Sequence, residues 1–258
     1  MTVLPIWLTG ILFVVVMPAL AVVTQLVIRR AWPALVDGGH NDVAGFIIAV
    51  VGVIYAVLLA FVVIVSWEDF SRAESTVGQE ASALRSIYRA SEAFPPDVRE
   101  HIRADVLRYA TTTIEVEWPA MARGEPGSPE LYGVLDDLAQ TLVQLPAGTP
   151  VQQEYVGAEA DRFEQLVVFR SERLDFVEKG VPAVLWIALG VGAVVTIGFA
   201  MIFGLRSTTL HLIMTASLSA VIGVLLFVSI AIDRPFDGDV SVDPGPLQRV
   251  ISDFRNAP

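Results

Sequence analysis

The chain has 258 residues, no cysteine and a formal net charge of −11, and 54% of its residues are hydrophobic, well above the share usual in a soluble domain. The absence of cysteine excludes disulfides, thiolate catalysis and thiolate metal sites. The negative charge is concentrated: residues 67–180 contain 21 Asp and Glu against 11 Lys and Arg, a net of −10, which leaves −1 for the rest. Without a basic face to neutralise phosphates, nucleic acid is not expected as a partner.

Four long apolar runs lie two on each side of this acidic stretch. They cover about Leu4–Ile28, Val43–Ser66, Val181–Phe203 and Leu210–Ile232, and none contains Asp, Glu, Lys or Arg. A helix needs roughly 20 apolar residues to cross the ~30 Å hydrocarbon layer of a bilayer. The runs therefore predict a polytopic membrane protein, with the lipid bilayer as its first partner and four transmembrane helices (2+2) around a helical soluble insert.

The same pattern predicts the domain organisation. We expect a first transmembrane pair over 1–66, an acidic helical insert over 67–180, a second pair over 181–232 and a polar C-terminal tail over 233–258. The leader Met1–Pro5 has no Lys or Arg, and the run that follows exceeds the 7–15 apolar residues of a signal-peptide core. We interpret the first run as a retained membrane helix, bent at Pro18.

The insert carries helix signals throughout. Neither Gly nor Pro occurs between Gly52 and Gly78, so the second span should continue unbroken out of the bilayer. A later apolar stripe should end near Trp118-Pro119. Ser128-Pro129 is typical of an N-cap followed by proline, and Thr149-Pro-Val-Gln152 is typical of a capping box. Because no stretch alternates convincingly at period two, the predicted fold class is all-α.

A stripe of small residues follows the second span. At 100° per residue its members fall within an arc of about 100°, and they are Asn41, Gly45, Ala49, Gly52, Ala56 and Ala60. One interpretation is close packing against another membrane helix. The other is that this helix lines a central pathway in an oligomer, with Phe46 and Phe61 as constrictions that gate by expelling water. Ala188-x-x-x-Gly192 and Ser219-x-x-x-Gly223 fit ordinary helix packing.

No catalytic signature is present. The three histidines, His40, His101 and His211, are far apart, and no HExxH or Walker-type loop occurs. Glu115 and Glu117 point to opposite sides of a helix, and we interpret them as a solvated helix end. Ionisable groups inside membrane spans usually mark ion-coupled transport, and we expect none in these spans. We predict neither enzyme activity nor a cofactor.

Three aspartates in the tail are weak candidates for a metal site. Asp237, Asp239 and Asp243 offer the hard oxygen ligands that Ca²⁺ prefers. The segment lacks the closing bidentate Glu of an EF-hand, so the expectation leans towards no metal.

Several motifs together resemble a known family. They are Asn41-Asp-Val-Ala-Gly45-Phe, Gly52-Val-Ile-Tyr55 with Trp67-Glu, Glu117-Trp-Pro119 and Asp233-Arg-Pro-Phe-Asp-Gly238. The chain is similar in these to the bacterial bestrophin-like proteins of unknown function (DUF4239), over nearly its whole length. The resemblance implies a plan of two spans, a helical domain and two spans, in a bacterial plasma membrane. Bestrophins are pentameric anion channels whose second membrane helix lines the pore, and Gly45-Phe46 is similar to their glycine-aromatic neck.

Two features depart from that family. The aspartates of the tail are sparser than the bestrophin calcium clasp. The net charge of −10 on the insert repels anions and favours cations at a vestibule.

Membrane orientation has two opposing arguments. Arg29, Arg30 and Arg206 lie in the short loops, which the positive-inside rule places in the cytosol, with the insert and termini outside. The resemblance implies the reverse. Cations near the membrane ends of the insert partly offset the loop arginines, and these are Arg72, Arg170, Arg173 and Lys179. We expect a cytosolic insert and cytosolic termini.

Two functions from different classes follow from these observations. The leading one is a homo-oligomeric, channel-like membrane protein, expected to be a homopentamer, that conducts small ions along the second span. The alternative is a membrane-anchored helical sensor or scaffold without transport activity. A pore needs a cyclic oligomer, whereas a sensor can work as a dimer.

Overall fold

The computed structural model describes residues 5–36 and 41–255, so Leu4 and His40 lie outside the described residues. Every regular element in these two ranges is helical, which confirms the all-α prediction. The chain divides into two compact units. Unit 1 contains Met1–Glu68, Gly180–Asp233 and Gly238–Val240, and unit 2 contains Asp69–Lys179, Arg234–Asp237 and Ser241–Pro258.

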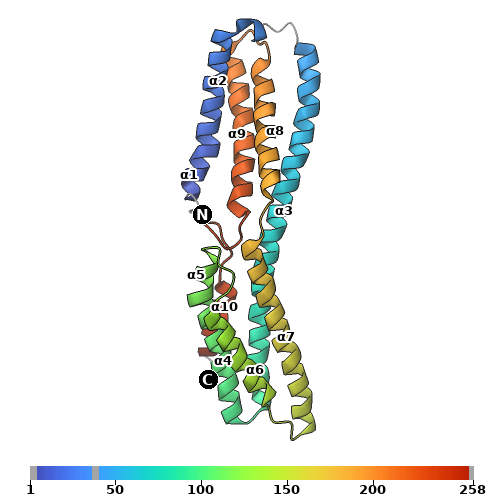
Figure 1. Cartoon of the computed structure of the whole chain (residues 1–258), viewed down its shortest axis with the longest axis vertical. Helices are drawn as coiled ribbons and strands as arrows, with labels where there is room; N and C mark the ends of the chain where they lie inside the picture. Colours follow the sequence, from blue (N-terminus) through green and yellow to red (C-terminus); the bar gives the residue numbers. More distant parts are fainter. Residues whose placement is uncertain (1–4, 37–40, 256–258) are drawn as a thin grey trace. The chain divides into compact units, whose positions relative to one another are not determined.

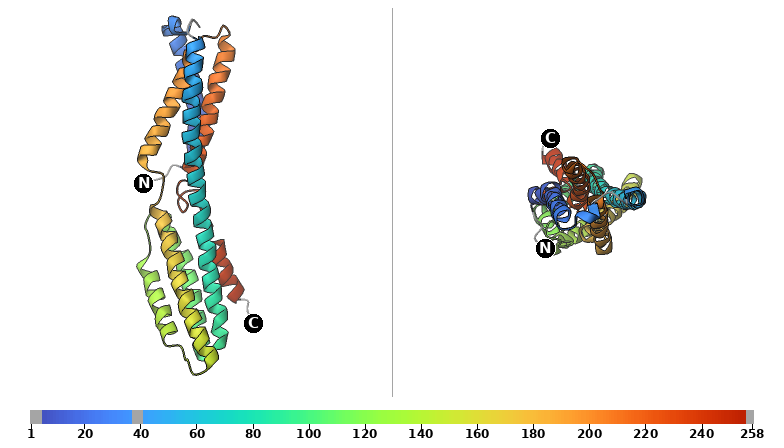
Figure 2. Two further views of the ribbon diagram at one scale, coloured as in Figure 1. Left: turned by 90° about the vertical axis from the view of Figure 1, so that its right-hand side faces the viewer. Right: turned by 90° about the horizontal axis from the view of Figure 1, so that it is seen from above.

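Unit 1 is a bundle of membrane-type helices. In chain order they are α1 (Ile6–Ile11), the π-helical η1 (Leu12–Val16), α2 (Met17–Ala31), the 3₁₀ turn η2 (Pro33–Val36), the first part of α3 (Asn41–Ala90), α8 (Ala183–Ile202) and α9 (Thr208–Ile232). Within the described residues, four helices are long and apolar enough to cross a bilayer, the first being α1, η1 and α2 taken together. They run side by side within the unit (Figures 1 and 2).

The predicted continuity of the second span is confirmed. α3 is a single helix of 50 residues, and its residues 41–68 belong to unit 1 while residues 69–90 belong to unit 2. A helix that lacks Gly and Pro from residue 53 to residue 77 has no position at which its hydrogen-bond ladder is interrupted.

Two prolines inside helices each follow a π-helical turn. Pro18 comes two residues after η1, and Pro119 comes two residues after η4 (Thr113–Glu117). Proline has no N–H, and its ring clashes with the carbonyl four residues earlier, so the wider turn accommodates it. The helix predicted to end near Trp118-Pro119 therefore continues through α5 (Trp118–Met121).

Two glycines bring the helices of unit 1 close together. The ring of Tyr55 on α3 lies where a Cβ on Gly192 of α8 would be, and the carbonyl of Phe13 lies where a Cβ on Gly223 of α9 would be. Lipid provides no hydrophobic drive between helices, so close contact at small residues is what holds such a bundle together. Both sequence motifs predicted as packing sites thus contain a glycine at a close helix contact.

Unit 2 is a helical domain around one hydrophobic core. Its elements are the second part of α3, the 3₁₀ turn η3 (Ser91–Ala93), α4 (Pro96–Thr112), η4, α5, α6 (Pro129–Val143), α7 (Pro150–Glu178) and α10 (Gly245–Arg255). Both predicted caps are present: the Ser128 hydroxyl accepts from the Leu131 N–H at 3.4 Å, and Thr149 forms a capping box with Gln152.

α10 is an element that the sequence analysis did not predict. Leu247 and Val250 of this helix are fully buried in the core of unit 2, and the Phe254 ring stacks on Tyr88 with 3.4 Å between centroids. Part of the expected polar tail is therefore a packed helix of unit 2.

Candidate functional site

The membrane segment of α3 has one buried face and one open face. Tyr55, Leu59, Val62 and Ser66, spaced 4-3-4, are buried against the other helices of unit 1. This spacing places them on one side of the helix. Only 17% of the most apolar stretch of α3 is buried. Most of the surface of this stretch is therefore available to lipid, to another copy of the chain or to a water-filled lumen.

The stripe of small residues divides into two parts. Ala49, Ala56 and Ala60 are exposed, and a Cβ added at Gly52 would meet nothing within 4 Å. These four positions therefore do not serve as packing sites inside the protomer. At Gly45, by contrast, an added Cβ would lie 3.8 Å from the Phe203 ring.

Asn41, the first residue of the stripe, has a structural role at the start of α3. Its amide Nδ2 donates to the Gly204 carbonyl at 2.8 Å, and its Oδ1 accepts from the Gly204 N–H at 2.9 Å. Arg29 donates from Nη2 to the neighbouring Leu205 carbonyl at 2.6 Å. The connection between α8 and α9 is thus held by side chains from α2 and α3, and the Asn41 amide is engaged there.

The two candidate gate residues are both exposed on α3. The Phe46 side chain is 73% exposed and the Phe61 side chain is 57% exposed. Aromatic rings that their own protomer leaves uncovered are free to line a lumen or to contact lipid or a neighbouring copy.

The three tail aspartates do not act together, and two of them have partners elsewhere. A carboxylate oxygen of Asp239 accepts from the Ile6 N–H at 2.9 Å in unit 1. In unit 2, Oδ2 of Asp237 lies 3.7 Å from Nη1 of Arg234. Asp243 precedes α10. Among residues 5–36 and 41–255, no group of three or more His, Cys, Asp or Glu is gathered as a set of metal ligands.

A buried ion-pair network lies in unit 2, and the sequence analysis missed it. Arg173 on α7 donates to both carboxylate oxygens of Glu80 on α3, at 2.6 and 3.0 Å, and to Glu117 on η4 at 2.7 Å. Arg170, one turn earlier on α7, donates to Glu117 at 2.6 Å. Two cations face two carboxylates, so the network is neutral, and nearly all of it is inaccessible to solvent.

The network is completed by neutral groups. The Tyr109 hydroxyl donates to Glu80 at 2.6 Å, and the Ser128 N–H donates to Glu117 at 3.2 Å. Burial, assisted by the Glu80 charge, raises the pKa of Tyr109 well above its usual value, so the hydroxyl keeps its proton and remains a donor. Burial disfavours the Arg173 cation, but the charges of Glu80 and Glu117 and the hydrogen bond to Glu80 together hold the Arg173 pKa above its usual value.

This network corrects two interpretations. Glu117 is not part of a solvated helix end, because its side chain is fully buried and paired; the adjacent Glu115 is exposed. Arg170 and Arg173 are not free cations at the membrane end of the insert, because they serve the core of unit 2.

An ionisable residue also lies within the fourth span. His211 is buried in the first turn of α9, and its Nε2 lies 2.9 Å from the Ala200 carbonyl of α8. The expectation that the spans hold no ionisable group is therefore wrong at this position. Several polar side chains accompany His211 in unit 1, and they are Gln25, Thr196, Thr215 and Ser219.

Comparisons with known proteins agree with the family resemblance. A family model described as "Bestrophin-like domain" matches residues 15–247. Among curated protein sequences, none matches this chain.

Solved structures of a bacterial bestrophin homolog from Klebsiella pneumoniae share the fold. One superposes with a TM-score of 0.70 at 13% identity, covering 95% of this chain and 99% of the homolog. Two point variants of that homolog give TM-scores of 0.72 and 0.74 at 13% identity, covering 97% and 95% of this chain and 99% and 98% of theirs. Another solved chain, described only as a membrane protein, has a TM-score of 0.73 at 13% identity and covers 95% of this chain and 98% of its own.

Proposed function

Because the chain belongs to the bestrophin-like family, we propose that it forms a homo-oligomeric channel that conducts small ions along α3. The observation that carries this proposal is the open face of α3. Ala49, Gly52, Ala56 and Ala60 form a continuous line of small side chains that unit 1 leaves uncovered. A line of small residues around a common axis keeps a lumen wide, whereas bulky residues there fill it.

The proposed assembly is a ring of five copies with α3 nearest the axis, in a bacterial plasma membrane. A single protomer has no evident ion pathway along this face, so the proposal requires a cyclic oligomer. Native mass spectrometry of the detergent-solubilised protein tests this directly. A pentamer supports the proposal, and a sample that contains only monomers contradicts it.

Transport is tested on the same assembled material. In liposomes loaded with a fluorescent ion reporter, the reconstituted ring should conduct, and ion substitution then gives the selectivity. The net charge of −10 over residues 67–180 favours cations if that segment borders the entrance. A well-folded oligomer without flux under any ion gradient would favour the sensor or scaffold function instead.

Phe46 is the proposed gate. It lies beside Gly45 near the start of α3 and is the more exposed of the two candidate aromatic residues. A hydrophobic ring closes a pore by dewetting, so Phe46→Ala should enlarge single-channel currents and relax selectivity. Phe61→Ala is the matched control on the same helix. Enlarged currents only in Phe61→Ala would place the gate about four turns further along α3.

The proposed orientation places residues 67–180 and both termini in the cytosol. Arginine lies close to each short connection, with Arg29 and Arg30 in the last turn of α2 and Arg206 between α8 and α9. This argues for the opposite arrangement, so the two possibilities differ in a measurable way. A C-terminal fusion to a reporter that is active only in the cytoplasm should be active. An inactive fusion, together with an active periplasmic reporter at the same site, would reverse the orientation.

A further inference from the structure

The interior of unit 1 contains an unusual number of polar atoms without hydrogen-bond partners. Within the described residues, such atoms belong to eight side chains of unit 1, two of which are Arg29 and Ser66. The other six are each at most 5% exposed, and they are Gln25, Tyr55, Thr196, His211, Thr215 and Ser219. An unpaired polar group in an apolar interior is unfavourable, and the great majority of such groups in proteins are paired, often with ordered water. Six of them in one four-helix core indicate that something hydrogen-bonds to them.

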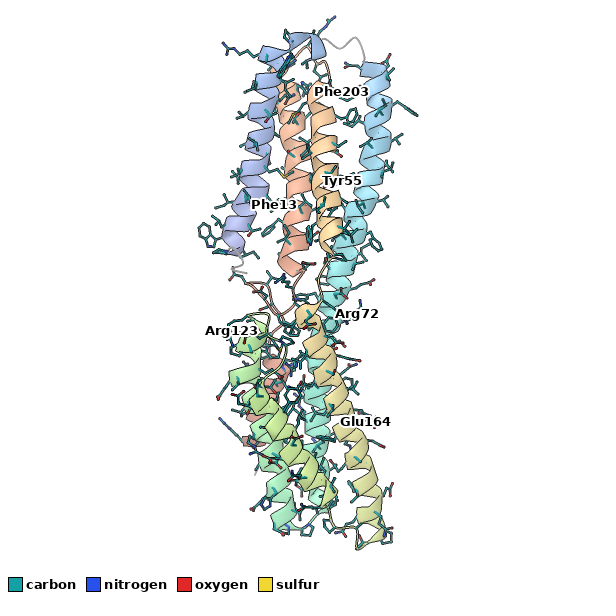
Figure 3. The ribbon with its side chains drawn as sticks, in the orientation of Figure 1. Phe13, Tyr55, Arg72, Arg123, Glu164 and Phe203 are labelled. Atoms are coloured by element: carbon teal, nitrogen blue, oxygen red, sulfur yellow. The ribbon has the colours of Figure 1, made fainter. Side chains whose placement is uncertain are left out.

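The helix register places these side chains at successive levels of the bundle. α8 and α9 run antiparallel, and the 2.9 Å contact from His211 Nε2 to the Ala200 carbonyl aligns them. One turn further along both helices, Thr196 and Thr215 come to the same level. One more turn brings Ser219 level with Gly192. The ring of Tyr55, which is labelled in Figure 3, packs against Gly192.

The same reasoning places Gln25 beside His211. The Phe13 carbonyl lies against Gly223, so the first membrane helix and α9 are aligned at that level. Gln25 is twelve residues after Phe13, and His211 is twelve residues before Gly223 on the antiparallel helix. Equal rises along both helices bring the two side chains to one level, within about a residue.

An apolar layer follows immediately. Leu59, Leu189 and Ile222 lie one turn beyond Tyr55, Gly192 and Ser219, and each is at most 4% exposed. These six polar side chains therefore occupy one part of the core, from the level of Gln25 and His211 to that of Ser219, and hydrophobic side chains occupy the next level.

We propose that this part of the core of unit 1 is a binding site for a column of internal water molecules, closed at one end by the layer of Leu59, Leu189 and Ile222. The site lies within the protomer and is separate from the open face of α3. It therefore stands whether or not α3 lines a pore.

The chemistry of the side chains selects water over an ion. The Ala200 carbonyl can only accept, so His211 donates to it from Nε2, and in the neutral ring Nδ1 is left as an acceptor. The Gln25 amide offers donors and an acceptor, and the hydroxyls of Thr215 and Ser219 offer both. No carboxylate is among the six side chains to hold a cation, and no Lys or Arg is among them to hold an anion. Water, which both donates and accepts, satisfies this mixture.

The absence of native cysteine allows a direct test on the full-length protein. Single-cysteine variants Thr215→Cys, Ser219→Cys and Ile222→Cys place a thiol on successive turns of the same buried face of α9. Ag⁺ is a soft ion that binds thiolates, and a thiol ionises readily only where it contacts water. The folded variant is treated with Ag⁺ and then denatured, and the thiols that Ag⁺ has blocked are measured as a loss of labelling by maleimide.

The proposal predicts blocking at positions 215 and 219 at least about tenfold faster than at 222, because an apolar environment raises the thiol pKa. Equally slow blocking at all three positions would show a dry core and overturn the proposal. Equally fast blocking at all three would show that the layer of Leu59, Leu189 and Ile222 does not close the water column.

Thr215→Val provides a second readout that needs no access route for Ag⁺. This change keeps the shape of the side chain and replaces the hydroxyl by a methyl group. In a dry core, removal of an unpaired hydroxyl raises the melting temperature; where the hydroxyl binds water, its removal lowers it. A lowered melting temperature supports the hydrated site, and a raised one contradicts it.

Discussion

The two units treat their buried polar groups in opposite ways. In unit 2, Glu80, Glu117, Arg170 and Arg173 are all paired at hydrogen-bonding distance. In unit 1, Gln25 and Thr215 are equally buried and have no partner within the described residues. Unit 2 uses complementary charges to specify its packing, whereas unit 1 is held by close contacts at glycine and leaves these two side chains for the proposed internal water. The comparison indicates that the charge network of unit 2 finds its hydrogen-bond partners within the unit, whereas these polar side chains of unit 1 need partners from outside the protein.

The largest expected effect comes from breaking the charge network of unit 2. Arg173→Met removes the cation that bridges Glu80 and Glu117 and leaves Glu80 buried without a cation, while Arg170 still pairs with Glu117. Loss of one partner of a buried ion pair typically costs about 3–5 kcal/mol. We expect a collapse of the melting temperature of unit 2, measured by circular dichroism in detergent.

The control for this prediction is a surface ion pair of the same unit. Arg123 is exposed and pairs with the exposed Glu125. Surface pairs contribute little, so Arg123→Met should leave the melting temperature almost unchanged. Equal effects of the two substitutions would contradict a structural role for the buried network.

The close contacts of unit 1 come next in expected size. Gly192→Ala drives a methyl group into the Tyr55 ring, whereas a Cβ at Gly190, two residues away on α8, meets nothing within 4 Å. Overpacking of a tight interior typically costs about 1–3 kcal/mol. Thermal unfolding should therefore show a destabilised Gly192→Ala and a neutral or slightly stabilised Gly190→Ala. Similar melting temperatures for both would show that α3 and α8 separate easily.

A smaller and pH-dependent effect should arise at Glu159, the exception among the buried charges of unit 2. Its side chain on α7 is fully buried; one oxygen accepts from Arg162 at 2.7 Å, and the other has no partner within the described residues. Burial raises the pKa of Glu159 to about 7, although the Arg162 charge opposes the shift. The folded state therefore holds this proton to higher pH than the unfolded state, and stability falls as pH rises from about 5 to 8.

Glu159→Gln should remove that dependence. After allowance for solvent screening, we expect the variant to gain about 1 kcal/mol over the original chain at pH 8 and little at pH 5. Glu164→Gln, at an exposed position of the same helix (Figure 3), is the control and should not change the pH profile. An unchanged profile in Glu159→Gln would show that this carboxylate does not titrate in that range.

The features predicted correctly from sequence are those encoded locally. Four apolar runs of sufficient length give four membrane helices, and the capping residues Ser128 and Thr149 each act within three positions of themselves. The continuity of α3 follows from the absence of helix breakers over residues 53–77. Each of these signals is complete within one short window of sequence.

The features that were missed depend on contacts between distant segments. Glu117 pairs with Arg170 and Arg173, more than fifty positions later, so its own neighbourhood suggested only a solvated helix end. A usable signal was nonetheless present, because Arg170 and Arg173 follow Leu166 at helical spacing and so lie on the same buried face of α7. Charges on the apolar face of a helix predict a buried partner.

The role of the small stripe depends on a different kind of information. Its spacing on α3 predicts a face but not what covers that face. The structure divides the stripe into Asn41 and Gly45, which contact the α8–α9 region, and four positions that the protomer leaves open. In the proposed assembly, those four positions face the lumen between copies of the chain.

The most direct test of the central claim therefore places a large side chain on each side of α3. Gly52→Trp projects from the open small stripe, and Ile54→Trp, at an exposed position almost opposite on the same helix, is the matched control. Both variants are examined by native mass spectrometry and by liposome flux. The account predicts that Gly52→Trp assembles into the same ring and no longer conducts, while Ile54→Trp assembles and conducts. Loss of the ring in Gly52→Trp, or flux in both variants at the level of the original chain, would contradict a lumen lined by this face of α3.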